Sequence, residues 1–149
     1  MASGVEYVRG DLLASDLQTH VNCVNCVGVM GAGIALAFKR RHPAMFADYA
    51  ARCARGEVAR GVPYLYRGDG RPQVVNFPTK GHWRGAARLE DVEAGLARLA
   101  AHVEEWGVTS LAVPLLGCGL GGLDETAVRA LIERHLGALG VPVRVYLSK

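Results

Sequence analysis

The sequence predicts an α/β fold in which a mixed, mostly parallel central sheet is sandwiched between helices. Short apolar runs of the length of buried strands alternate along the chain with longer segments of helical periodicity. Two glycine clusters, at 28–33 and 117–122, each follow an apolar run and precede a helical segment. Such alternation places parallel strands side by side and covers both faces of the sheet with helices.

The expected elements follow one another without an internal repeat or a low-complexity linker. Strands are expected at 5–8, 21–24, 64–67, 73–77, 110–115 and 143–147. Helices are expected at 34–41, 44–55 and 88–106, and a last one, capped by Asp124, is expected to reach about residue 139. Gly68-Asp69-Gly70 is expected to form a hairpin turn, and Gly107 to end the third helix.

Length and composition predict one domain over residues 1–149. The chain has 149 residues, half of them hydrophobic, which suffices for a core without disulfides or metal. It stops just after the last expected strand, so it can be the N-terminal domain of a longer protein. No stretch reaches the apolar length of a membrane span, and the N-terminus lacks a basic signal-peptide region, so we expect a cytoplasmic protein. A net charge of +3 permits an anionic ligand or nucleic acid without requiring either.

The four cysteines do not predict a metal site. Cys23 and Cys26 form a CxxC without a second pair, and residues three apart on a strand face opposite sides. We therefore expect buried structural thiols, with zinc binding or redox chemistry as the alternative. No other cluster of metal ligands is present in the sequence, so no metal cofactor is expected.

The paired glycine loops predict a phosphate site. Glycine lets the backbone approach a ligand closely, and helix N-termini offer free N–H groups to anions. One such loop can be a plain tight turn, but two in a short domain favour the diphosphate of a nucleotide-like ligand. Gly117, Gly119 and Gly122 match the dinucleotide pattern G-x-G-x-x-G, yet they lie in the last third of the chain, where that motif does not belong. A P-loop motif is absent from the sequence.

Lys80 is the strongest candidate for a catalytic residue. An apolar strand delivers it to a loop, with Pro78 before it and Gly81 after it. Desolvation or the nearby cation Arg84 would favour a neutral, nucleophilic amine. The alternative is that Lys80 pairs with phosphate or lies in solvent.

Four segments in order resemble the macrodomain family over essentially the whole chain. They are Gly10-Asp11-Leu12-Leu13, Val21-Asn22-Cys23-Val24-Asn25, Gly31-Ala32-Gly33-Ile34-Ala35 and the run from Pro114 to Gly122. The resemblance implies an ADP-ribose pocket at the crest of the sheet, with Asp11 on the adenine amino group and Asn22 and Asn25 near the distal ribose. The other implied contacts are Leu12, Gly28, Val29, Met30, Gly31, Ala32, Gly33, Ile34, Thr79, Leu116, Gly117, Cys118, Gly119, Leu120, Gly121, Gly122 and Leu123. Asp11 has a plainer interpretation as a turn cap, and the asparagines as partners of local backbone groups.

Asn76-Phe77-Pro78-Thr79-Lys80, followed by His82-Trp83-Arg84, resembles the lysine-dependent branch of that family. This branch holds the terminal ADP-ribose protein glycohydrolase and the DarG antitoxins, to which the chain is more similar. The resemblance implies removal of ADP-ribose from thymine bases in DNA, which reverses the modification made by the partner toxin DarT. It also implies that Lys80 is the catalytic residue. No cofactor is implied, since ADP-ribose is the ligand and product. In the protein-directed glycohydrolase an aspartate assists catalysis at the position that Gly121 occupies here. The group that assists release of the base therefore stays unassigned in this chain.

Three questions remain open from the sequence. His82 is a candidate acid–base group. His82, Trp83 and Arg84 are candidate DNA contacts, since an aromatic ring and an arginine stack on bases, although Trp83 can equally be core and Arg84 a solvated charge. A non-catalytic ADP-ribose reader, and a hydrolase of ADP-ribosylated glutamate or acylated ADP-ribose, are the alternative functions.

Overall fold

The central sheet has six strands in the order β1-β6-β5-β2-β4-β3. The computed structural model describes residues 4–68 and 72–147. The strands are β1 (Val5–Arg9), β2 (Thr19–Val24), β3 (Tyr64–Tyr66), β4 (Gln73–Pro78), β5 (Leu111–Pro114) and β6 (Val143–Leu147). Every neighbouring pair is parallel except β3 with β4, which is antiparallel. The predicted mixed, mostly parallel sheet is therefore confirmed.

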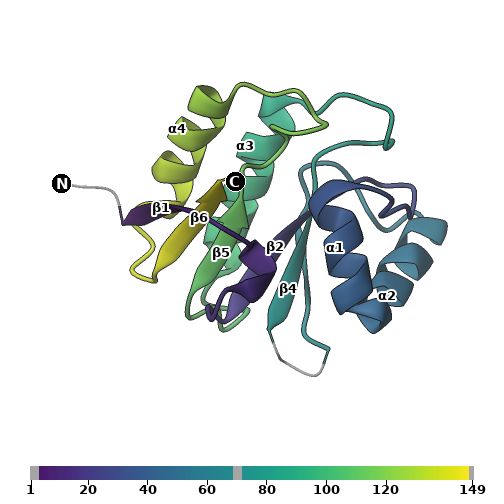
Figure 1. Ribbon diagram of the computed structural model, residues 1–149, viewed down its shortest axis with the longest axis horizontal. Helices are drawn as coiled ribbons and strands as arrows, with labels where there is room; N and C mark the ends of the chain where they lie inside the picture. The colour runs from purple at the N-terminus through teal and green to yellow at the C-terminus, as the bar shows by residue number, and fades with distance from the viewer. Residues whose placement is uncertain (1–3, 69–71, 148–149) are drawn as a thin grey trace.

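Helices cover both faces of this sheet (Figure 1). The first pair is α1 (Gly33–Arg41) and α2 (Pro43–Ala54), and the second is α3 (Leu89–His102) and α4 (Glu125–Leu136). A short 3-10 helix, η1 (Leu12–Ala14), follows β1. One core cluster joins α3 and α4 to the sheet, and a second joins α1, α2 and η1 to its other face. The alternation of side chains along each strand supplies both cores.

Two predicted helix ends were wrong. The third helix ends at His102 rather than at 106, because the chain turns there and the Val108 N–H donates to the Val103 carbonyl at 2.9 Å. Gly107, with φ +65°, completes this turn instead of capping the helix. The fourth helix ends at Leu136 rather than near 139, where two glycines, Gly137 and Gly140, disfavour helix. The expected turn at 68–70 lies largely outside the described residues.

Helix α3 packs very closely on β4 at Gly95. A Cβ atom at this position would overlap the ring of Phe77, which is fully buried. The absence of a side chain at Gly95 therefore sets the distance between α3 and the sheet.

The parallel strands bring the segments that follow them to one edge of the sheet. Residues 25–32 follow β2, residues 79–88 follow β4 and residues 115–124 follow β5. Parallel α/β sheets bind ligands at this carboxyl edge. Within the described ranges, no helix is long and apolar enough to cross a membrane.

Candidate active site

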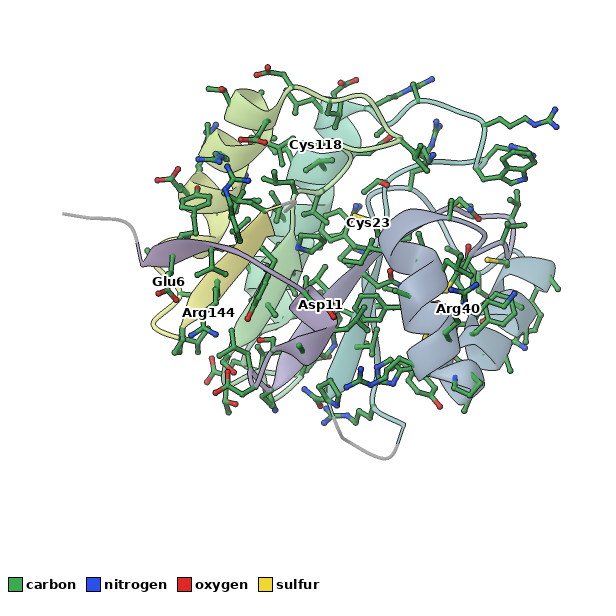
Figure 2. All side chains as sticks on the ribbon, viewed as in Figure 1. Glu6, Asp11, Cys23, Arg40, Cys118 and Arg144 are labelled. Atoms are coloured by element: carbon green, nitrogen blue, oxygen red, sulfur yellow. The ribbon has the colours of Figure 1, made fainter. Side chains whose placement is uncertain are left out.

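A cavity of about 1020 Å³ opens at the carboxyl edge of the sheet. Its walls come from the loops after β2, β4 and β5, from the N-terminal half of α1, and from the segment after β1. Asp11, Cys23 and Cys118, which line three of these walls, lie one above another in the middle of Figure 2. The loops that were predicted to act as a pair thus meet in one cavity.

Most of the predicted ligand contacts line this cavity. They are Asp11, Leu12, Asn25, Val29, Gly31, Ala32, Gly33, Ile34, Thr79, Gly117, Cys118, Gly119, Leu120 and Gly121, together with Lys80 and Trp83. Of the described residues that line it, Lys80 alone has a basic side chain, and Asp11 and Glu125 alone are acidic. The lining of the cavity is therefore largely apolar and rich in glycine, with the Lys80 side chain and the N-terminus of α1 as its positive groups.

Asp11 caps a turn and also lies in the cavity wall. Its Oδ1 accepts a hydrogen bond from the Leu13 N–H at 3.0 Å and so caps η1. The residue also lines the cavity. A carboxylate has two oxygens, so capping through Oδ1 leaves the other for a ligand.

Asn25 organises the first glycine loop. Its Nδ2 donates to the Val29 carbonyl at 2.8 Å, and its Oδ1 accepts from the Val27 N–H at 3.0 Å. The Tyr49 hydroxyl of α2 lies 2.7 Å from Oδ1 and 2.8 Å from the main-chain oxygen of Asn25. Burial raises the pKa of Tyr49, which therefore stays a hydrogen-bond donor at neutral pH. The Asn25 side chain therefore bonds to local backbone groups, as one of the two interpretations of the sequence expected.

The same loop presents the N-terminus of α1 to the cavity. Gly28 and Gly33 have φ values of +84° and +58°, which only glycine adopts readily. The N-cap residue Ala32 has no side-chain cap bond, and Ala32, Gly33 and Ile34 line the cavity. Uncapped N–H groups of a first helical turn bind anions, and the helix dipole favours negative charge there.

The second glycine loop is shaped by close packing. The Leu123 N–H donates to the Gly117 carbonyl at 2.9 Å, and Gly117 has φ +76°. A Cβ atom at Gly121 would lie 2.5 Å from the Gly117 oxygen and 2.9 Å from the Ala87 Cβ. An aspartate at 121 would require the backbone to shift. This gives a steric reason why the chain has glycine here, where the protein-directed glycohydrolase has aspartate.

Lys80 enters the cavity from the loop after β4. The Thr79 N–H donates to the Val24 carbonyl at 3.0 Å, which ties this loop to the end of β2. The half-buried Lys80 donates from Nζ to the main-chain oxygen of Trp83 at 2.9 Å. Burial raises the pKa of the neighbouring Cys23 thiol to about 11, so that thiol is neutral at pH 7. Lys80 is thus the candidate nucleophile that the cavity exposes.

Trp83 and its neighbours form the rim beside Lys80. Trp83 is 44% exposed, so the interpretation of this ring as core was wrong. The Arg84 guanidinium stacks 4.5 Å from the centre of the Trp83 ring, and the His82 ring lies 5.2 Å from it. His82 and Arg84 do not line the cavity, and His82 Nδ1 accepts from the Arg84 N–H at 3.1 Å.

Asn22 lies beneath the cavity rather than in its wall. The strand alternation turns it to the α1 and α2 face, where it is fully buried. Its Nδ2 donates to the Asn76 Oδ1 at 3.1 Å, next to the Met30 sulfur, and its own Oδ1 has no partner. Asn22 is therefore not part of the cavity lining, and its expected place near a distal ribose stays a prediction. The other predicted contacts outside the lining are Gly28, Met30, Leu116, Gly122 and Leu123.

Several lining residues were not anticipated from the sequence. They are Gly10, Leu13, Cys23, Val24, Ala35, Ala37, Pro114, Leu115, Glu125, Tyr146 and Leu147. Most of them end a strand or begin a helix at the carboxyl edge, which is a signal that the element boundaries could have supplied. Glu125, in the first turn of α4, pairs with Arg129 at 2.8 Å.

The cysteines are free thiols. Burial raises the pKa of Cys23, Cys26, Cys53 and Cys118, although all four keep some exposure. Across the described residues, no group of His, Cys, Asp and Glu side chains is arranged to hold a metal ion.

Comparison with known proteins places this fold and cavity in one family. The family model of the Macro domain matches residues 21–132. The solved macrodomain of Thermus aquaticus DarG is 43% identical, with a TM-score of 0.87 over 97% of each chain. Thermosipho africanus DarTG, solved in complex with ADP-ribose, is 36% identical, with a TM-score of 0.92 over 96% of this chain and 41% of that one. The chain belongs to the Macro domain family, and its resemblance to DarG macrodomains is confirmed.

The related DNA ADP-ribosyl glycohydrolases are longer than this chain. A DNA ADP-ribosyl glycohydrolase of Mycobacterium tuberculosis is 50% identical over 123 residues, which cover 80% of this chain but 35% of that protein. The Thermus aquaticus protein of the same name is covered to 41%. The chain thus spans about two fifths or less of these relatives.

Proposed function

We propose that this protein is an ADP-ribosyl glycohydrolase that removes ADP-ribose from thymine bases in DNA, with Lys80 as its catalytic residue. The observation that carries the proposal is the Lys80 side chain in the lining of a cavity that also holds both glycine loops and the N-terminus of α1. Relatives that are about half identical bear the name DNA ADP-ribosyl glycohydrolase, which agrees with this substrate.

We propose that ADP-ribose lies in the cavity with its adenine toward Asp11 and its distal ribose toward Lys80. In the proposed complex, Asp11 accepts a hydrogen bond from the adenine amino group. The N-terminus of α1 and the loop at 117–121 hold the diphosphate, because both offer main-chain N–H groups. The distal ribose then lies toward Lys80, with Asn25 and Thr79 nearby on the cavity wall.

The reaction needs a neutral Lys80 amine. The amine attacks the anomeric carbon of the distal ribose, a new C–N bond forms, and the glycosidic bond breaks with its electron pair going to the thymine nitrogen. That nitrogen takes up a proton. The sugar ring of the lysine adduct opens to an imine, to which water adds. Collapse of the adduct releases ADP-ribose and restores the amine, so that the net reaction consumes one water molecule.

The substrate strand is proposed to cross the rim at His82, Trp83 and Arg84. Arg84 offers a positive charge to a DNA phosphate, and the exposed ring of Trp83 offers a stacking surface. His82 is not in the cavity wall, but its ring lies 5.2 Å from that of Trp83, so we propose it as a contact for the strand and leave the acid that protonates the base unassigned.

We also propose a toxin as the biological partner. The related Thermosipho africanus chain is named as a fusion of a DNA ADP-ribosyl transferase with a DNA ADP-ribosyl glycohydrolase. In this proposal the chain is the N-terminal domain of a longer cytoplasmic antitoxin that reverses the modification made by a DarT transferase. Co-purification of the full-length protein with that transferase tests this part.

The activity is tested by measuring release of ADP-ribose from two substrates. One is a single-stranded oligonucleotide that carries an ADP-ribosylated thymidine, and the other is a protein ADP-ribosylated on glutamate. We expect the wild type to act on the oligonucleotide, and Lys80→Ala to bind ADP-ribose without releasing it. Binding without release from either substrate would show a non-catalytic reader. Release from the glutamate substrate alone would show a hydrolase of protein-linked ADP-ribose.

A further inference from the structure

Exposed apolar side chains gather at the mouth of the cavity. Among the described residues, the large apolar side chains classed as exposed are those of Val27, Val29, Val62, Trp83 and Leu120. Val29, Trp83 and Leu120 all line the cavity, and Leu120 is 75% exposed. A grouping of exposed apolar surface around one opening marks a binding surface rather than chance exposure.

The two loops that carry Trp83 and Leu120 are fastened to each other. The Ala87 N–H donates to the Gly121 carbonyl at 3.1 Å. Ala87 also lies where a side chain at Gly121 would be, so the loop segments 81–87 and 117–122 are in direct contact. They run side by side above α3 in Figure 1. Trp83 and Leu120 therefore stand on adjacent walls of one mouth.

The backbone of Trp83 also reaches the reaction centre. Its main-chain oxygen accepts the hydrogen bond from Lys80 Nζ at 2.9 Å. The residue whose ring lines the cavity is thereby tied through its backbone to the amine. The Leu120 side chain offers no polar atom and Trp83 offers only its indole N–H, so this mouth holds few of the donors that a carboxylate needs and suits a flat, weakly polar group better.

We infer that Trp83 and Leu120 form an apolar clamp for the nucleobase that carries the ADP-ribose, and that this clamp selects a base as leaving group over an amino-acid carboxylate. The inference rests on the proposed function, whose substrate it specifies. The base lies between the two side chains at the mouth while its ADP-ribose fills the cavity. Arg84, stacked on Trp83, serves the adjoining phosphate.

The clamp is tested by comparing two ligands in a variant that cannot turn over. In the Lys80→Ala background, binding is measured for free ADP-ribose and for an oligonucleotide with an ADP-ribosylated thymidine. Trp83→Ala and Leu120→Ala are each added to this background. Val62→Ala is the matched control, because Val62 is 41% exposed but does not line the cavity. Trp83→Ala keeps the main-chain oxygen at 83, so the backbone around residue 80 is retained.

We expect Trp83→Ala to weaken binding of the modified oligonucleotide by about 5- to 150-fold, as loss of a base–aromatic contact does, and Leu120→Ala to weaken it as well, while binding of ADP-ribose changes little in both. Trp83→Phe should restore most of the affinity, and Val62→Ala should have no effect. Equal losses for both ligands, or no loss for the oligonucleotide, would overturn the clamp.

The activity assay separates failure of the clamp from failure of the proposed function. This assay uses proteins that keep Lys80. If the wild type releases ADP-ribose from the oligonucleotide and kcat/KM is unchanged in Trp83→Ala and Leu120→Ala, the clamp alone is refuted. Wild type that binds the oligonucleotide more tightly than ADP-ribose but never releases ADP-ribose would refute the proposed function and leave the clamp standing.

Discussion

The Nζ atom of Lys80 lies 2.9 Å from the main-chain oxygen of Trp83. The side chain proposed to carry the reaction is thus held by the backbone of the residue whose ring stands at the cavity mouth. An oxygen that accepts a hydrogen from the amine does not take its proton away, since a peptide carbonyl is a very weak base. Substrate that moves the amine from this oxygen toward the distal ribose would bring the amine into position for attack.

The first prediction concerns the imine. Wild-type protein incubated with the modified oligonucleotide and sodium cyanoborohydride should acquire the mass of a reduced ADP-ribose adduct, and peptide mapping should place it on Lys80. Lys80→Arg keeps a charge and a donor for the Trp83 oxygen, but it does not lose its proton at neutral pH. We expect that variant to bind ADP-ribose and to form neither adduct nor product. An adduct on another residue would contradict the mechanism.

The second prediction concerns the steric role of Gly121. Gly121→Ala places a Cβ 2.5 Å from the Gly117 oxygen and 2.9 Å from the Ala87 Cβ. We expect a loss of about 1–3 kcal/mol of unfolding free energy, as for overpacking, and weaker binding of ADP-ribose because the loop must shift. Gly119→Ala is the control for stability, since a Cβ there meets no atom within 4 Å. Urea unfolding should separate the two variants, and equal midpoints would contradict the steric account.

Much of the site followed from the sequence because its parts are local. A strand that runs into a loop places Lys80 at the carboxyl edge, and a glycine cluster before a helix places main-chain N–H groups there. Asn22 shows where this reasoning stops: it shares a motif with Asn25, but its amide is buried against Asn76 and Met30 beneath the cavity, whereas Asn25 lines it. This difference depends on how helices pack on the strand, which a local motif does not give.

Other features depend on contacts between distant segments and could not be read from local patterns. The contact of Ala87 with Gly121 joins loops that follow different strands, and these loops carry Trp83 and Leu120, which line the same cavity. Tyr146 and Leu147 line the cavity only because β6 lies between β1 and β5 in the sheet. Strand order is set by packing of the whole chain, so the expected strand end marked these residues as lying at the carboxyl edge but not as neighbours of this cavity.

The third prediction concerns the anchor of the first glycine loop. Tyr49→Phe removes the hydroxyl that lies 2.7 Å from Asn25 Oδ1 and 2.8 Å from its main-chain oxygen. Because both acceptors are buried, we expect unfolding free energy to fall by about 1–3 kcal/mol. Calorimetry should also show weaker binding of ADP-ribose, since residues 27–29 lose support. Tyr66→Phe, on the edge strand β3, is the control. Unchanged affinity in Tyr49→Phe would show that the loop is held by other contacts.

The fourth prediction concerns acid destabilisation through His20. This side chain is 1% exposed, its Nδ1 has no partner, and burial lowers its pKa below the ordinary value of 6.5. Unfolded protein then binds a proton near pH 6.5 that the folded protein does not. Stability contributed by neutral His20 is therefore present above pH 6.5 and is lost as the pH falls below it. Urea midpoints measured from pH 7.5 to about 5.5 should decline less in His20→Asn than in the wild type, while His102→Gln, on α3, should decline as the wild type does.

The last prediction concerns the contact of α3 with the sheet. In an exposed helix, Gly→Ala stabilises by about 0.5–1 kcal/mol because glycine loses more backbone entropy on folding. At Gly95 the sign should reverse, because the new Cβ would overlap the Phe77 ring, which is fully buried. We expect Gly95→Ala to lower the unfolding free energy by about 1–3 kcal/mol. Phe77→Leu alone should also be destabilising, since it leaves a cavity. The double variant should be more stable than the sum of the two losses predicts, because the smaller side chain makes room for the new methyl group. Additive losses in a double-mutant cycle would show that Gly95 and Phe77 do not determine each other's packing.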